Sequence, residues 1–502
     1  MKNSIKVGIA TALTTVLFGV AGGHVAHADS IFIHDSLQNP KVEQVYRGNV
    51  LTGYDDPDRL DKMTNPMPNV QHQKKFARVK VNMLGNTPLH NYPTADDSGE
   101  KNAFNTTLYL PTGFNVSPKE HGNYQSVVVA NDSIYLVESM GTGTNEGDIV
   151  RFKLSDLEDL GLFKEGGASL LLQAYDFTNP YNNSSNNMQM LMTLGDVKKA
   201  MDSQNGLQTT INNIQTQISA QNTSVNNLNA LIKKTNKNKK LKTKDKKKAV
   251  SGYKKQINNT KKLISSLNQQ LATPKQQYQD NEDTINAAKQ KYPFLNNLSA
   301  IQKAVQISPL INVGHGQTLS WNPKTQHLYL AQDESLKDLT PGQNNNVTEL
   351  DPNTLEPIRQ YHFRLQQGGT SMQMHTLTFD NDGNAYIGRK RGANYVIFKG
   401  RLDTNNISFK PVGQMLNWWK GAANQCLSYN AANNRLYVVS NDAIVSVPVD
   451  KLGNGILSND DVHYTTFNTG REFEGLGFDS SGRGYMLMLW KPELLQTQDP
   501  MN

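Results

Sequence analysis

Polar side chains recur at one position of a repeated sequence phrase, and they are the residues best placed to do chemistry. Each copy of the phrase reads polar residue, apolar segment, turn, second apolar segment. If the first apolar segment is a β-strand, side chains two positions apart lie on the same side of it. Most copies therefore present two polar groups at the strand start. In an early copy, Ser126 is a weaker match to this polar position. The candidate ligand-binding residues are His315, Gln317, Gln373, His375, Gln425, Glu472 and Glu474.

Histidine and glutamate can hold metals or transfer protons, so a secreted hydrolase or lactonase is one interpretation of this set. The sequence contains no H-E-x-x-H, no G-x-S-x-G and no paired cysteines to support it. The phrase from Asp380 to Gly383 begins like a calcium loop but lacks the later acidic ligand, so we interpret it as a hairpin turn. We assign no catalytic residue, metal or cofactor, and favour a binding surface over an enzyme.

The spacing of the phrase predicts the fold. Its second-strand tyrosines, Tyr329, Tyr386, Tyr437 and Tyr485, are 57, 51 and 48 residues apart. Units of about 50 residues with several short strands each are typical of a β-propeller. A β-sandwich also has regular short strands but lacks this self-similarity. We predict an all-β propeller of five or more blades, with further strands in residues 40–120, where 77–82 and 106–111 have strand character.

A helical segment interrupts the repeats at residues 195–306. Apolar residues there follow a heptad pattern, with polar Gln221 and Thr260 at two seam positions, and Pro274 is expected to end or kink the second helix. Two such helices predict an inserted antiparallel coiled-coil hairpin with arms of about 35 Å. The predicted seams are Leu207, Ile211, Ile214, Ile218, Val225, Leu228 and Ile232 in one helix and Tyr253, Ile257, Ile264, Leu267 and Leu271 in the other.

The predicted tip of the hairpin is a lysine block that only Asp245 opposes. Such a block repels itself, so we expect it not to be helical throughout. It is either a solvated loop or a site for polyanions, here anionic cell-wall polymer or a membrane surface. Nucleic acid is disfavoured because no aromatic residues alternate with the lysines. The candidate polyanion-binding residues are Lys233, Lys234, Lys237, Lys239, Lys240, Lys242, Lys244, Lys246, Lys247 and Lys248.

The N-terminus predicts export. Two lysines, an apolar stretch and the small-residue motif Ala26-His27-Ala28 form a signal peptide over residues 1–28. No later stretch is apolar enough to span a membrane, so we expect a secreted protein, possessing at most a non-covalent attachment to the cell surface. The single cysteine, Cys426, excludes an internal disulfide and is expected to be buried. We also expect Trp418 and Trp419 to pack rather than to bind sugars.

The predicted organisation has five parts. The signal peptide is followed by an N-terminal region, 29–110, that could help to close the propeller. The first part of the propeller covers 111–194, the inserted hairpin 195–306 and the second part of the propeller 307–502. The charge is unevenly spread, since residues 196–291 contain nineteen lysines against six acidic residues in a chain of net charge +7. Such asymmetry indicates an interaction segment.

Two of the repeats resemble a known family. The phrases FDNDGNAYIG and EFEGLGFDSSGRGYMLMLW, within residues 379–388 and 472–490, are similar to those of the helveticin group, large secreted bacteriocins of lactic acid bacteria. The resemblance covers residues 120–194 and 307–502, while the lysine-tipped hairpin and residues 29–110 depart from the pattern. It implies non-enzymatic antibacterial action at the envelope of related Gram-positive bacteria. The alternatives are an adhesin on the producer's own wall and a propeller hydrolase.

Overall fold

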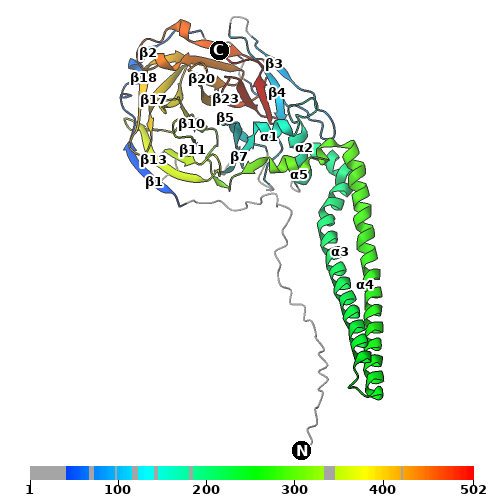
Figure 1. Ribbon diagram of the computed structural model, residues 1–502. Helices are drawn as coiled ribbons and strands as arrows, with labels where there is room; N and C mark the ends of the chain where they lie inside the picture. The colour runs from blue at the N-terminus through cyan, green and yellow to red at the C-terminus, as the bar shows by residue number, and fades with distance from the viewer. Residues whose placement is uncertain are drawn as a thin grey trace, which may run out of the picture.

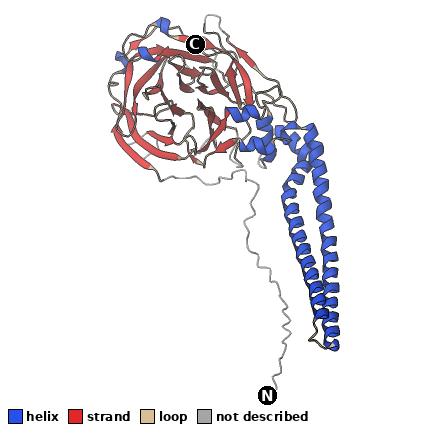
Figure 2. Cartoon of the chain, in the orientation of Figure 1, coloured by secondary structure: helices blue, strands red, loops and turns tan. Residues whose placement is uncertain are grey.

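The structure is a computed structural model, which describes residues 41–66, 70, 73–95, 99–115, 122–140, 145–179, 185–332, 345–419 and 422–502. The predicted signal peptide lies outside these residues. The chain is largely β-sheet, folded into five sheets, and one long helical hairpin extends from them (Figures 1 and 2). None of the helices in the described ranges has the length and hydrophobicity needed to cross a membrane.

Each repeated phrase forms the first two strands of one sheet, as an antiparallel pair. The strand pairs predicted from the repeats are therefore confirmed. We number the sheets by the order of these pairs along the chain. The first sheet comprises β5 (Tyr124–Ala130), β6 (Ser133–Ser139), β7 (Glu146–Lys153) and β8 (Val305–Ile307), and β9 (Ile311–Asn312) also pairs with β7. The second sheet comprises β10 (Leu319–Asn322), β11 (His327–Gln332), β12 (Asn345–Leu350) and β13 (Pro357–Gln367), and β14 (Thr370–Met372) pairs with β13.

The other three sheets repeat this order. The third sheet comprises β15 (Thr378–Phe379), β16 (Ala385–Arg391), β17 (Asn394–Leu402) and β18 (Ile407–Asn417). The fourth comprises β19 (Cys426–Asn430), β20 (Arg435–Ser440), β21 (Ala443–Pro448) and β22 (His463–Thr466). The fifth comprises β23 (Phe473–Phe478), β24 (Gly484–Met488) and β25 (Glu493–Thr497). The turn at Asp380 is a hairpin turn as predicted, because its carboxylate accepts hydrogen bonds from the backbone of Asp382 and Asn384.

The N-terminal region adds outer strands to sheets that later residues begin. β1 (Glu43–Asn49) and β2 (Asp61–Lys62) pair in parallel with β13 and β18. β4 (Ala103–Tyr109) pairs with β25 and carries β3 (Asn91–Pro93) at its outer edge. The strand expected at 106–111 thus exists, but 77–82 forms no strand. Within the described residues, the region extends existing sheets and does not build another.

Successive sheets share hydrophobic cores. Separate clusters of buried residues fill the space between the first and second, second and third, third and fourth, and fourth and fifth sheets. A fifth cluster joins the fifth sheet back to the first, for example through Leu487 and Leu136. Trp418 lies in the cluster between the third and fourth sheets, so its predicted packing is confirmed. Cys426 is buried as well, which raises the pKa of its thiol to about 12.

Short side chains hold the innermost strands together. β5 lies beside β10 and β23, β10 beside β15, and β15 and β23 beside β19. Each of these strands is the edge of its sheet, so its free backbone groups need partners. The Ser126 hydroxyl donates to the Gly316 carbonyl (2.8 Å), and Thr318 donates to the His375 carbonyl (2.7 Å). Ser320 donates in the same way to the Leu377 carbonyl.

The helices are inserted within the first sheet, between β7 and β8. They are α1 (Leu154–Asp159), α2 (Leu170–Thr178), α3 (Ser185–Lys237), α4 (Thr243–Lys291) and α5 (Leu298–Lys303). The insertion therefore begins before residue 195, and α3 itself starts ten residues earlier than the predicted boundary. The hairpin lies inside one repeat unit and not between two.

The two long helices form the predicted antiparallel pair (Figure 1). All twelve apolar residues of the predicted seams are buried or half-buried, as are Gln221 and Thr260. The amide of Asn281 donates to the Ser203 hydroxyl (2.6 Å), so these two residues lie opposite each other. Of the two outcomes expected at Pro274, the end of the helix is wrong, because α4 continues through it to Lys291. The 53 residues of α3 span about 80 Å, more than twice the predicted arm.

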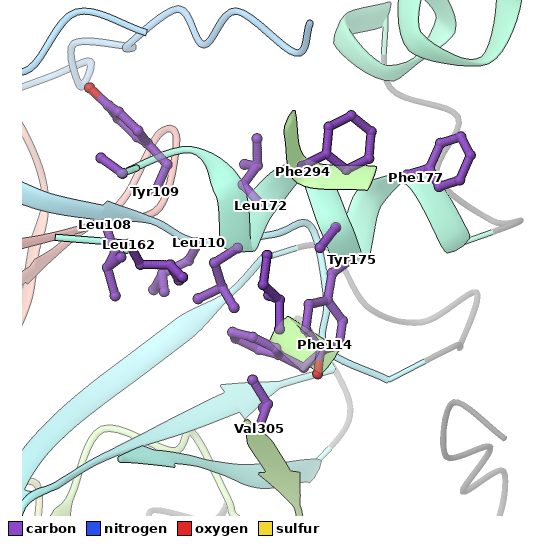
Figure 3. Packing of buried hydrophobic residues seen from close by; sticks show 14 of the residues in the cluster. Leu108, Tyr109, Leu110, Phe114, Leu162, Leu172, Tyr175, Phe177, Phe294 and Val305 are labelled. Carbon is purple, nitrogen blue, oxygen red and sulfur yellow. The ribbon is translucent and has the colours of Figure 1, made fainter. Parts of the chain in front are cut away.

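The base of the hairpin is built into the core between the first and fifth sheets. Met190, Leu194 and Val197 of α3 and Ile285 and Ala288 of α4 belong to this cluster. Figure 3 shows its centre, where Phe114 and Tyr175 meet edge to face with ring centroids 4.9 Å apart. Phe177 of α2 packs on Phe294 in the same way, at 5.6 Å. The hairpin is therefore anchored by apolar packing.

The junction between β23 and β5 should tolerate no side chain at Gly475. A Cβ there would lie 2.7 Å from the backbone nitrogen of Val127 and 3.1 Å from the Cα of Ser126. We expect Gly475→Ala to lower the free energy of unfolding by about 1–3 kcal/mol, the usual effect of overpacking. Urea denaturation of the purified protein measures this.

Gly195→Ala is the matched control, because nothing lies within 4 Å of the added methyl group in α3. Alanine favours helix more than glycine, so this variant should be about 0.5–1 kcal/mol more stable. Equal urea midpoints for Gly475→Ala and the unmodified protein would contradict the close approach of the two strands.

Candidate functional site

Three of the seven predicted ligand-binding residues meet at the starts of the inner strands. The side-chain amide of Gln317 donates to Gln425 Oε1 (2.6 Å) and to Glu474 Oε2 (3.3 Å). Gln425 in turn donates to Asn441 Oδ1 (3.0 Å). Gln317 precedes β10, Gln425 precedes β19 and Glu474 lies in β23, so the cluster joins the second, fourth and fifth sheets.

Glu474 is an acid held away from water. Its side chain is 3% exposed, and burial raises the pKa of its carboxyl well above the usual range. The negative charge of Glu472 raises it further, while the hydrogen bond from Gln317 acts in the opposite direction. The environment therefore favours the neutral carboxylic acid. A neutral acid can donate a hydrogen bond, but it is a poor base and a poor metal ligand.

The other four predicted residues differ in exposure. His315 and His375 are exposed, and Gln373 is half-buried. Glu472 is half-buried and accepts a hydrogen bond from the indole nitrogen of Trp490 (2.7 Å). In the part of the chain that the structure describes, no three His, Cys, Asp or Glu residues are grouped so that they could hold a metal ion.

Gln125 is a counterpart that the sequence analysis missed, because Ser126 was assigned to its position. The early copy reads Gln125-Ser126-Val127, which matches Gln317-Thr318-Leu319, so Gln125 takes the polar position of this copy. Ser126 bonds to the neighbouring strand as Thr318 does, which confirms this register. Gln125 is 3% exposed, and its Oε1 atom has no hydrogen-bond partner. The recurring Gln-small-apolar triplet was the signal available in the sequence.

A cavity of about 240 Å³ lies below the cluster, between the five inner strands. Its walls come from β5, β10, β15, β19 and β23, and one end reaches Gln317. The other end reaches the exposed turn residues Asn131, Asn381, Ala431 and Ser480. The hydrogen-bonded cluster of Gln317, Gln425 and Glu474 therefore lies at one end of the cavity, and the exposed turns lie at the opposite end.

A second group of acids is buried where no sequence pattern indicated it. Glu138 and Asp148 face each other on β6 and β7, and neither side chain is exposed to solvent. Glu138 Oε1 and both carboxyl oxygens of Asp148 have no hydrogen-bond partner. Burial raises the pKa of Asp148 to about 8 and that of Glu138 well above its usual range. The pair therefore favours protonated acids within the core.

The ten predicted lysines gather at the end of the hairpin, far from the sheets (Figure 1). Lys233, Lys234 and Lys237 close α3, residues 238–242 form the only break in the helices, and Lys244 begins the lysines of α4. The block is thus not helical throughout, although the break is short. All ten are exposed except Lys246, which is half-buried and donates to the Asn236 carbonyl (3.5 Å). None takes part in an ion pair with another described residue.

Comparisons with known proteins give no family. No family model matches the chain, and no curated protein matches its sequence. Among solved structures, U3-55K is 10% identical with a TM-score of 0.21 over 36% of this chain and 50% of that one. A glucose dehydrogenase is 9% identical with a TM-score of 0.23 over 36% and 62%. The extracellular domain of BT4673 from B. thetaiotaomicron is 11% identical with a TM-score of 0.19 over 36% and 33%.

Glu474 should make stability depend on pH. Its pKa is raised in the folded protein, so the unfolded chain releases this proton at a lower pH than the folded one. Stability from this group is fully present below the unfolded pKa, near 4.5, and is lost as pH rises toward the folded pKa. We expect Glu474→Gln to unfold at a melting temperature that falls less between pH 5 and pH 8 than that of the unmodified protein.

Glu472→Gln is the matched control, because Glu472 is only half-buried and its pKa is raised less strongly. Its melting temperatures should follow those of the unmodified protein more closely across the same pH range. If Glu474→Gln shows the same pH dependence as the unmodified protein, Glu474 is ionised in the folded state and the interpretation of its burial is wrong.

Proposed function

We propose that the five sheets are the blades of a five-bladed β-propeller. Shared cores between successive sheets, and between the fifth and the first, support this arrangement. So do the inner strands, which neighbour one another in a closed order around one cavity. β4 comes from the N-terminal region and pairs with β25 near the C-terminus, which is a common way to close such a ring.

We infer that the protein is a secreted, non-enzymatic protein that binds the bacterial envelope through the tip of its hairpin. The observation that carries this proposal is the placement of ten lysines, unpaired by any described acid, at the end of a rigid arm. A dense positive charge attracts polyanions, and the arm lets the tip reach a polymer while the sheets stay clear of it. Anionic cell-wall polymer is the partner that matches an exported protein.

The strand-start residues supply a second surface in this proposal. His315 and His375 are exposed, with Gln373 and Glu472 half-buried beside them, above a cluster that is already hydrogen-bonded. Such a surface can donate and accept hydrogen bonds without any reactive group, as recognition of a glycan, peptide or protein requires. Together with the resemblance of two repeats to helveticins, this favours an antibacterial protein that acts on related bacteria.

Shortening the hairpin should abolish binding to cells. The structure shows where to cut, because Ser203 and Asn281 face each other and the residues nearer the sheets belong to the core. Residues 210–274 are replaced by a short Gly-Ser loop, which removes the tip and leaves Val197 and Ile285 in place. Mixed with intact Gram-positive cells at low salt, the full protein should pellet with the cells and the shortened one should stay in solution.

High salt and cell survival complete this experiment. Salt should release the full protein, because exposed charges are screened beyond a Debye length of about 8 Å at physiological ionic strength. Falling viable counts would support the antibacterial function, and unchanged counts would indicate an adhesin. If the shortened protein pellets as well as the full protein, the sheets bind the cells and the proposed role of the tip is wrong.

A further inference from the structure

Pairs of lysines recur along α4 from the tip toward the sheets. They are spaced seven residues apart, which is about 10.5 Å along a helix. Their spacing matches the heptad of the seam, so all pairs lie on one flank of the hairpin. The three pairs are Lys247 and Lys248, Lys254 and Lys255, and Lys261 and Lys262, hereafter the lysine strip.

The seam residues show which flank this is. Tyr253, Ile257 and Thr260 face α3. Lys254 and Lys261 each follow a seam residue by one position, and Lys255 and Lys262 follow it by two. The first position flanks the seam and the second points away from α3. The exposure agrees, since all six lysines of the strip are exposed, while Lys246 at a seam position is half-buried.

No acidic residue opposes the strip along its length. α4 has no Asp or Glu between residues 246 and 279, and α3 has none from residue 203 to its end. The charge changes sign nearer the sheets, where Asp280, Glu282 and Asp283 follow. Glu282 and Asp283 occupy the same two heptad positions as the lysine pairs. The positive flank is therefore bounded by acids at the base and continues into the lysine tip.

We propose that the lysine strip binds a linear chain of phosphate groups, laid along the flank of α4 and reaching the tip. This inference rests on the proposed function and adds the geometry of its ligand. The strip is about 22 Å long, from Lys247 to Lys262, and a rigid helix holds its pairs at regular distances. A flexible polyanion that follows the helix contacts every pair, while a single phosphate contacts one.

The flank has no group that would select a nucleobase. The only aromatic residues between 195 and 291 are Tyr253 and Tyr278, and both are half-buried at seam positions. Single-stranded nucleic acid is normally held by bases stacked on exposed aromatic rings. The chemistry on this flank is lysine alone, so the ligand is a phosphate polymer without bases.

The test compares two variants of the full chain with equal loss of charge. The strip variant replaces Lys247, Lys248, Lys254, Lys255, Lys261 and Lys262 by Gln, and the tip variant replaces Lys233, Lys234, Lys237, Lys239, Lys240 and Lys242 by Gln. Glutamine favours helix about as well as lysine, and circular dichroism checks that helix content is kept. The probes are linear polyphosphate of about 60 units and tripolyphosphate, titrated at several NaCl concentrations.

We expect the strip variant to lose the preference of the protein for the long chain over tripolyphosphate. The slope of log K against log [NaCl] for the long chain should fall by about 4, since each neutralised phosphate contributes about 0.7. The tip variant should bind both probes more weakly and keep its preference for the long one.

Other results would overturn the inference. If the strip variant keeps both slope and length preference while the tip variant weakens, the strip is only a solvated face and the proposed function of the tip stands. If neither variant differs from the unmodified protein, the proposed function fails as well. If single-stranded DNA with equal numbers of phosphates binds tenfold more tightly than polyphosphate, the ligand is not a base-free polymer.

Discussion

Contact between the innermost strands is the constraint on which the rest of the molecule depends. Each of these strands is a sheet edge and lies beside the inner strands of the neighbouring sheets. Ser126, Thr318 and Ser320 donate to backbone carbonyls just before the next inner strand, and Gly475 lets β23 approach β5. A large side chain at these positions would push the sheets apart and open the cores between them. The phrase therefore repeats with small residues after its polar one.

Strand β4 of the N-terminal region joins the strands near the C-terminus in the fifth sheet, and a buried ion pair lies at this junction. Arg471 is 1% exposed and donates to Glu493 Oε2 (2.8 Å). It also donates to the carbonyls of Leu489 and Lys491, while Thr106 of β4 donates to Glu493. A buried pair is stabilising only when its remaining hydrogen bonds are made, and here they are. The N-terminal strands thus join a sheet whose other strands lie almost 400 residues later.

The helical hairpin depends on the same core. Its base shares one hydrophobic cluster with the first and fifth sheets, so its direction is set by packing. Beyond the base, the two helices pack on each other, and their exposed residues are mostly polar or lysine, with Leu231 and Leu263 as exposed apolar exceptions. The positive charge on this arm is therefore separated from the sheets, where burial raises the pKa of acids such as Glu474 and Asp148. The basic arm and the cavity between the inner strands can serve different ligands.

The sequence by itself determined the strand pairs and the hairpin, because local patterns specify both. Period-2 phrases with tight turns form hairpins wherever they lie, and the heptad seam from Leu207 to Leu271 requires a second helix to cover it. The position of the lysine block at the end of the hairpin followed directly from these two helices. Only the tertiary structure decided where the N-terminal strands pair, since β1, β2 and β4 bond to partners hundreds of residues away. It also decided that Gln317, Gln425 and Glu474 meet, and that Gln125 takes the equivalent position in the first sheet. The pairing of Glu138 with Asp148 on neighbouring strands is likewise a result of the tertiary structure. Contacts between sheets depend on how five separate sheets pack together, and no local pattern contains that information.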